Sequence, residues 1–233
     1  MVAHQPNYFP WVGFFAKLSR ADTFVILDSV QYSNNSYTHR CMIRNKEKAL
    51  WLTIPIPRKE YFKPINEVRL PQDNSWKNKH WKSILLFYSK AEHFSEIREF
   101  LERIFKKETF SKLVDLNLEV IRFFMENLNI KPKTLHLSEL PVNENAKKTD
   151  LIINIMKIVQ EDTYLSGMGG TRYIERASFE REDLRLKFFE FKPTAYKQRW
   201  KPFIPNLSIL DLVANVGFKN ARKYLKGRII SVL

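Results

Sequence analysis

The sequence predicts an α/β fold in which a mainly parallel β-sheet carries helices on both faces. Short apolar runs of strand length alternate along the chain with stretches whose apolar residues recur three and four positions apart, which is typical of β-α-β units. Residues 74–129 hold three helical patterns in succession without a strand. With 233 residues and 44% hydrophobic content, the chain can bury a sizeable core. We therefore expect a Rossmann-like sheet with a helical insertion.

Three sections are expected to pack as one compact unit. Residues 1–73 would form an N-terminal α/β half, residues 74–130 the helical insertion, and residues 131–233 a C-terminal α/β half. A separate helical bundle in the middle of the chain is the alternative.

Two prolines shape the first turn. Pro6 and Pro10 fix φ and remove two backbone donors, so no regular helix or central strand passes through them. A polar loop must therefore separate a first strand from a helix over residues 11–20, which leads into a buried strand at residues 23–27. This loop is the best candidate for a chemical site, and its candidate side chains are those of His4, Gln5, Asn7, Tyr8 and Trp11.

The remaining elements follow from the same patterns. Further strands are predicted at residues 51–56, 67–70, 133–137, 163–165 and 184–191, and further helices from residue 149, after residue 170 and at residues 207–215. Asp28 would stand at the carboxyl end of its strand. Ligands of open α/β sheets bind outside those ends, so we expect Asp28 near the first turn.

A strong positive charge favours anionic partners. The chain has 39 Lys and Arg against 25 Asp and Glu, and residues 187–228 hold ten basic and two acidic residues. Nucleotides, sugar nucleotides, nucleic acid and membrane surfaces all fit this charge. A solvated basic face is the alternative.

Cysteine usage and hydropathy indicate a cytoplasmic protein. Cys41 is the only cysteine, which excludes an intramolecular disulfide and a cysteine metal site. No apolar stretch approaches the length of a membrane span, and no signal core is evident. The scattered histidines lack metal-ligand spacing, so no metal site is expected.

A glycine-rich segment at residues 166–170 follows a predicted strand. Its backbone N–H groups, with Ser166, Gly169, Gly170 and the nearby Arg172, would hold a phosphate. The segment matches neither a dinucleotide-binding fingerprint nor a Walker A motif. A tight structural turn is the alternative.

Two further segments could contact an anionic substrate. Arg40 and Arg44 would grip a phosphate or carboxylate through paired hydrogen bonds, unless they are solvated surface residues. Aromatic and cationic residues mix at positions 196–205, where Tyr196 and Gln198 would contact substrate. Such mixing suits base stacking and equally a basic loop anchored on the core.

The chain resembles the WbqC-like family over nearly its whole length. The residues that carry the resemblance are Gln5-Pro6, Phe9-Pro10, Gly13-Phe14-Phe15, Ala21-Asp22, Phe24-Val25, Asp28-Ser29-Val30, Arg40, Ile43, Trp51 to Pro55, Tyr164, Gly169-Gly170, Tyr196-Lys197-Gln198, Phe203, Pro205 to Ile209 and Asp211. Proteins of this family are associated with bacterial gene clusters for O-antigen and other surface polysaccharides. The resemblance therefore implies a role in the biosynthesis of such polysaccharides. The family pattern accommodates other residues at the position of His4. The resemblance therefore favours Gln5, Asp28 and Arg40 over His4 as functional residues.

A second likeness concerns the first 27 residues. Their order of elements is similar to the opening of nucleotidyltransferases and pantoate-activating ligases with a His-x-Gly-His motif. Here His4 stands alone, so the likeness extends to the fold and not to the chemistry.

These observations predict a transferase or ligase that acylates or aminoacylates a nucleotide-linked amino sugar. His4, Gln5 or Asp28 would be catalytic, Tyr8 or Trp11 would stack on a base or sugar, and arginines would hold phosphates. The cofactor is left open between an acyl or aminoacyl donor and ATP. The alternative is a non-catalytic basic module that binds nucleic acid or an anionic partner protein.

Overall fold

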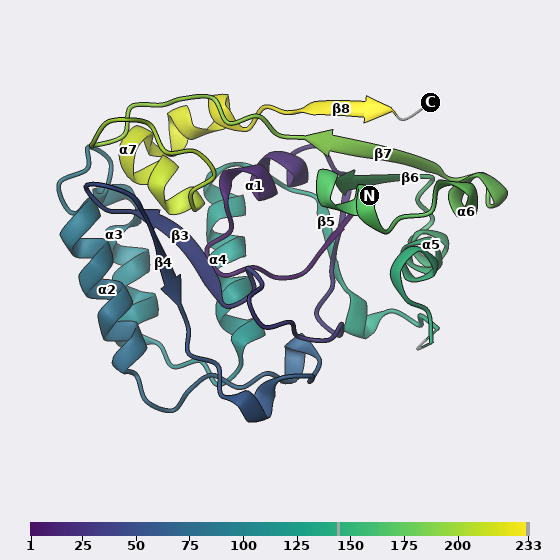
Figure 1. Ribbon diagram of the computed structural model, residues 1–233, viewed down its shortest axis with the longest axis horizontal. Helices are drawn as coiled ribbons and strands as arrows, with labels where there is room; N and C mark the ends of the chain where they lie inside the picture. Colours follow the sequence, from purple (N-terminus) through teal and green to yellow (C-terminus); the bar gives the residue numbers. More distant parts are fainter. Residues whose placement is uncertain (144, 232–233) are drawn as a thin grey trace.

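The computed structural model describes residues 1–143 and 145–231 (Figure 1). The predicted C-terminal half therefore includes residues 144, 232 and 233, which lie outside the described residues. The strands are β1 (Val2–His4), β2 (Thr23–Ile26), β3 (Arg40–Arg44), β4 (Ala49–Thr53), β5 (Lys133–His136), β6 (Thr163–Gly167), β7 (Arg185–Glu190) and β8 (Arg228–Ser231). The helices are α1 (Val12–Leu18), α2 (Ser75–Tyr88), α3 (Ser95–Glu102), α4 (Leu113–Asn127), α5 (Lys148–Val159), α6 (Arg176–Arg181) and α7 (Ile209–Ala221).

The described strands form three small sheets, so the single Rossmann-like sheet that the sequence predicts is not confirmed. Strands β1, β2 and β5 form a parallel sheet in the order β1-β2-β5, and β6, β7 and β8 form a second sheet in which only the β6–β7 pair is parallel. The Leu165 N–H donates to the Met1 carbonyl oxygen over 2.9 Å, so β6 lies beside the start of β1. The fold is therefore mixed α/β, with a parallel sheet of three strands.

Helices cover both faces of the parallel sheet, as expected. Phe24 and Ile26 of β2 join a core cluster with Phe124 of α4, whereas Val25, which lies between them, packs with Ile155 of α5. Side chains alternate across a strand, so α4 and α5 lie on opposite faces. In Figure 1 the helices α2, α3 and α4 gather at one end of the molecule and α5 and α6 at the other.

Strands β3 and β4 form an antiparallel hairpin, in which Arg40 pairs with Thr53. The predicted strand at residues 51–56 is this β4, which begins earlier and stops before Pro55 because proline has no donor for the ladder. A strand at residues 40–44 was not predicted, because its two arginines obscure the apolar alternation.

Two other predictions differ from the structure. Residues 67–70 do not form a strand: a 3₁₀ turn at Ile65–Glu67 is followed by a single bridge between Arg69 and Lys112. The segment after the glycines forms a 3₁₀ turn at Met168–Arg172, and the regular helix α6 starts only at residue 176.

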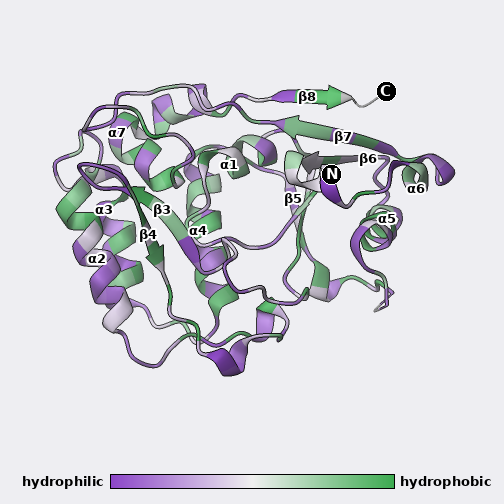
Figure 2. Cartoon of the chain, in the orientation of Figure 1, coloured by the Kyte–Doolittle hydropathy of each residue, from purple (hydrophilic) through white to green (hydrophobic). Residues whose placement is uncertain are grey.

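The helical stripes predicted between residues 74 and 129 are confirmed. Ile84, Ile97, Leu101 and Val120 are almost fully buried. In Figure 2 the ribbons of α2, α3 and α4 carry both hydrophobic and hydrophilic segments, as expected of helices with one buried face. One cluster contains side chains from all three predicted sections. The division into these sections stays a prediction.

Helix α7 continues beyond residue 215, where the sequence predicted its end. Its backbone breaks at Gly217, whose φ of 74° lies in the left-handed region that glycine tolerates. Within the described part of the chain, every helix is too short or too polar to cross a membrane.

Candidate functional site

A cavity of about 830 Å³ opens where β1 and β6 end. Its walls include His4, Gln5 and Trp11 from the first turn and Ser166 to Gly170 from the glycine-rich segment. The carboxyl ends of parallel strands are where α/β proteins place ligands, and the volume suits a ligand of drug size. The structure thus brings together two segments that are distant in the sequence and that were each predicted to bind.

Buried contacts fix the first turn. The Asn117 amide nitrogen donates to the carbonyl oxygens of Pro6 and Thr38, over 2.9 and 2.7 Å. At the end of the turn the Ile209 N–H donates to the Pro10 carbonyl oxygen over 2.8 Å. Pro6 and Pro10 therefore present acceptors to distant parts of the chain, and the turn has a set shape.

Trp11 forms a wall of the cavity by lying over the start of α1. A Cβ atom at Gly13 would stand 2.3–2.6 Å from atoms of the indole ring, so only glycine allows this packing. Phe191 contacts the same ring edge-on, with 5.4 Å between ring centroids. This packing gives the cavity an aromatic surface.

The glycine-rich segment forms a tight turn with one open position. Ser166 is buried, and its hydroxyl donates to the Gly167 carbonyl oxygen over 3.0 Å. A Cβ at Gly170 would stand 2.1 Å from that Ser166 hydroxyl oxygen, whereas a Cβ at Gly169 would meet nothing within 4 Å. Ser166 and Gly170 therefore shape the turn, and Gly169 exposes backbone.

Lys17 was missed by sequence reasoning. Its side chain lines the cavity and is only 5% exposed. The Lys17 Nζ atom lies 3.9 Å from where a Cβ would stand at Gly167, beside the glycine-rich turn. Within residues 1–143 and 145–231 it has no hydrogen-bond or ion-pair partner. A lysine on a helix that is otherwise apolar was the available signal.

Burial changes the protonation of both basic groups in the cavity. It lowers the pKa of Lys17 from 10.5 to about 8, because no carboxylate compensates for lost water. Burial, followed by the charge of Lys17, lowers the pKa of His4 to about 3. At neutral pH Lys17 is therefore mostly a cation and His4 is neutral.

The neutral His4 ring has a defined tautomer. Its Nδ1 atom lies 2.9 Å from the Gln5 carbonyl oxygen, which can only accept, so Nδ1 carries the proton. Nε2 then has a free lone pair. His4 can accept a hydrogen bond from a bound hydroxyl or amine.

Charged residues also stand at the cavity mouth. Lys148, the first residue of α5, is exposed there, and Glu190 of β7 is half-buried, with its carboxylate 3.5 Å from Lys192. The cavity thus has a buried cation at its base and a second cation near its opening.

Several predicted site residues do not line this cavity. Tyr8 is fully buried, and its hydroxyl lies 3.0 Å from the His80 Nδ1 atom. The exposed Arg172 lies in the 3₁₀ turn but outside the lining. Asn7 is buried and is likewise absent from the walls.

Arg44, Tyr196 and Gln198 belong to a buried network centred on Asp211. The Arg44 guanidinium donates to the Gln198 side-chain oxygen and to the Pro202 carbonyl oxygen. The Gln198 amide and the Tyr196 hydroxyl both donate to Asp211 Oδ2, over 2.9 and 2.6 Å. These three side chains therefore make internal hydrogen bonds and do not line the cavity.

Asp28 and Arg40 also point elsewhere. Asp28 is buried and contacts His136 and Ser138. The Arg40 guanidinium carbon lies 4.4 Å from the centre of the Trp51 ring. Neither side chain lines the cavity, although Leu27 and Val30, which flank Asp28 in the sequence, both do.

Comparison with known proteins identifies the family. The model of the WbqC-like protein family matches residues 5–223. The chain belongs to the WbqC-like protein family. An uncharacterized protein of Mycobacterium tuberculosis is 30% identical to this WbqC-like protein over 223 residues, which cover 95% of each chain. No solved structure matches this WbqC-like chain.

The family assignment confirms the resemblance read from the sequence. The match to the WbqC-like model includes Gln5, Lys17 and the glycine-rich turn, and it begins one residue after His4. No group of three His, Cys, Asp or Glu residues that could hold a metal ion occurs in the described ranges.

Proposed function

We propose that this WbqC-like protein is a transferase or ligase that holds the phosphates of a nucleotide-linked amino sugar in the β1–β6 cavity. The observation that carries the proposal is the buried Lys17 ammonium, which has no counter-charge among residues 1–143 and 145–231. An unpaired buried charge is costly unless a partner compensates it. A ligand that brings negative charge supplies that partner.

The surroundings of Lys17 support a phosphate. The open backbone at Gly169 allows close approach of an anion. Lys148 at the mouth adds a second positive charge within the same cavity. Trp11 offers an aromatic surface on which a base or sugar ring can stack.

The strand order also supports this position. We propose that the hydrogen bond between Leu165 and Met1 joins the two small sheets into a Rossmann-like order, β5-β2-β1-β6-β7. The order of the parallel strands reverses between β1 and β6, and ligands bind at such switch points. The cavity lies at this reversal.

His4 would orient the acceptor. A hydroxyl or amine that donates a hydrogen bond to the Nε2 lone pair would be held in place. Because a base with a pKa near 3 retains a proton poorly, we propose that His4 positions the acceptor and does not take its proton. The nucleotide-linked sugar is proposed from the family resemblance and the positive charge of the chain. Acyl or aminoacyl transfer is our hypothesis for the reaction and is derived from neither of them.

Titration calorimetry tests the assignment. Uridine and adenosine diphosphates and sugar nucleotides are titrated into the wild type, Lys17→Met and, as a matched control, Lys226→Met, which removes an exposed lysine of the basic C-terminal segment. We expect at least tenfold weaker binding, about 1.4 kcal/mol, for Lys17→Met alone. Equal binding by all three proteins, or no binding by the wild type, contradicts the proposal.

Binding of nucleic acid or an anionic partner by the basic residues 187–228 is the second candidate, favoured by their charge. Many exposed contacts with phosphates would make affinity fall steeply with salt, whereas a buried pocket depends on salt weakly. In that case Lys226→Met, and not Lys17→Met, would weaken binding.

A further inference from the structure

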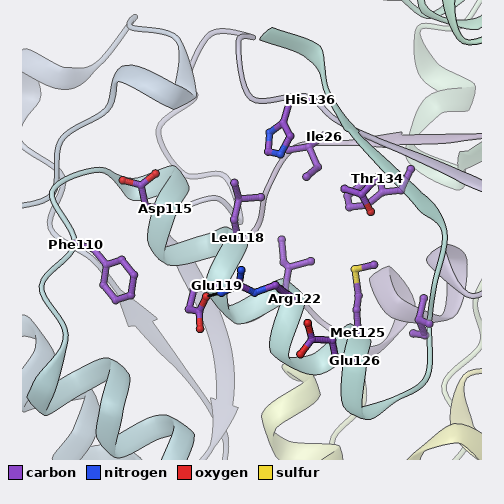
Figure 3. Close-up of a pocket in the computed structure, with 13 residues that line it drawn as sticks. Ile26, Phe110, Asp115, Leu118, Glu119, Arg122, Met125, Glu126, Thr134 and His136 are labelled. Atoms are coloured by element: carbon purple, nitrogen blue, oxygen red, sulfur yellow. Dashed lines mark hydrogen bonds and ion pairs between the residues drawn. The ribbon is translucent and has the colours of Figure 1, made fainter. Parts of the chain in front are cut away.

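A second cavity, of about 590 Å³, lies between α4 and the edge strand β5 (Figure 3). Its apolar lining includes Ile26 from β2 and Leu118 and Met125 from α4. It faces the side of the parallel sheet that carries α4, whereas α5 covers the opposite side.

A buried carboxylate orients a histidine at its edge. Asp28 is 3% exposed, and its Oδ2 atom lies 3.2 Å from the His136 Nδ1 atom. Ser138 fixes the same carboxylate, because its hydroxyl donates to Oδ2 over 2.7 Å and its N–H to Oδ1 over 2.9 Å. The carboxylate therefore cannot turn away from the imidazole.

This contact determines which nitrogen of His136 is available. A carboxylate only accepts, so Nδ1 carries the proton and, in the neutral ring, Nε2 has a lone pair. His136 lines the cavity, and within the described residues its Nε2 atom has no hydrogen-bond partner. A bound molecule can therefore donate a hydrogen bond to it.

Acidic side chains around the cavity favour a ligand with a positive charge. Asp115, Glu119 and Glu126 of α4 line it, and among the described residues of the lining Arg122 is the only lysine or arginine. Glu119 is engaged by Arg122 and, over 2.6 Å, by Arg103, whereas Asp115 and Glu126 have no ion-pair partner within the described ranges. In a chain of net charge +14, this cavity is a place that favours a cation.

We propose that this cavity binds an organic ammonium compound with an apolar body. Figure 3 shows Asp115 and His136 on either side of Leu118, and Met125 and Glu126 farther along α4. The ammonium group would donate to His136 Nε2, the carboxylates of Asp115 and Glu126 would favour its charge, and the apolar body would lie over Ile26 and Leu118. This site is independent of the phosphate site proposed above.

Binding of three matched probes tests the proposal by calorimetry. 4-Phenylbutylamine carries the ammonium, 4-phenylbutan-1-ol replaces it with a neutral hydroxyl, and 4-phenylbutyrate replaces it with an anion. We expect saturable binding of the amine, at least about tenfold weaker binding of the alcohol, and none of the carboxylate. Equal affinities for amine and alcohol, or no saturable binding of the amine, overturn the proposal.

Variants locate the ammonium. Asp115→Asn and His136→Phe should each weaken the amine about tenfold, and the exposed Asp115 serves as the test should His136→Phe not fold. Glu99→Gln, which removes an exposed carboxylate of α3 outside the cavity, and Lys17→Met should leave amine binding unchanged. Amine binding that survives Asp115→Asn and every folded His136 variant overturns the assignment.

Discussion

Lys17 illustrates, at the scale of a residue, what a linear pattern hides. The apolar spacing of residues 11–18 predicted the helix, and α1 is present. The pattern could not show that the lysine of this helix would be buried facing a cavity, because its exposure depends on β6 and the turn after it. Tertiary packing therefore decides that Lys17 is buried beside the cavity.

Replacing Lys17 by methionine should stabilise the protein while removing ligand affinity. The pKa of Lys17 falls from 10.5 in the unfolded chain to about 8 in the folded protein. Below pH 8 the buried ammonium is charged, which lowers the free energy of unfolding by about 3 kcal/mol. Between pH 8 and 10.5 the unfolded chain binds more protons, and stability rises with pH. Denaturant unfolding at pH 7 should show Lys17→Met to be more stable by 1–3 kcal/mol, a range within about that cost.

The control for this prediction is Lys226→Met, whose exposed side chain should leave stability nearly unchanged. A lysine with only a packing role gives the opposite result, since its replacement would lower the free energy of unfolding. Loss of stability in Lys17→Met at pH 7 thus contradicts the proposed role.

For individual helices, strands and turns, the spacing of apolar residues and the positions of proline and glycine predicted the structure wherever local sequence decides it. The first turn, α1, β2 and the buried faces of α2 to α4 were predicted. The hairpin β3–β4 was predicted in part, since its pairing partner is set by contacts distant in sequence. Arg40 and Arg44 were interpreted as free cations because the pattern does not reveal that Arg44 lies inside a network with Gln198.

The glycine-rich turn gives a matched pair of substitutions. In Gly170→Ala the new Cβ would stand 2.1 Å from the Ser166 hydroxyl oxygen, a clash that should destabilise the protein by about 1–3 kcal/mol. In Gly169→Ala it meets nothing within 4 Å, so stability should hardly change. Thermal unfolding of both variants measures the difference, and equal stabilities would show that the turn is not packed as described.

At the scale of the whole molecule, a few buried polar contacts connect distant sections. Asp211 of α7 accepts from Tyr88 of α2 over 2.8 Å, and Asn117 of α4 holds Pro6 of the first turn. Buried polar groups of this kind need all their partners. Three residues that carried the family resemblance, Tyr196, Gln198 and Asp211, take part in this network and do not line the cavity.

The division of roles across the molecule follows from these contacts. The first turn and the glycine-rich segment, which sequence reasoning proposed as parts of a site, line one cavity. Sequence reasoning placed Asp28 there too, because the strand end was identified but not the face on which the side chain emerges. Asp28 instead orients His136 beside the second cavity.

The central claim is that Lys17 is a buried cation awaiting an anionic ligand. Its titration by NMR, with the Lys17 signal assigned from Lys17→Met, measures this directly. We predict a pKa of about 8 for Lys17 in the free protein, and a rise toward its ordinary range when uridine diphosphate or a sugar nucleotide is added. A pKa already near 10.5 in the free protein, or one that no phosphorylated ligand changes, would contradict the account.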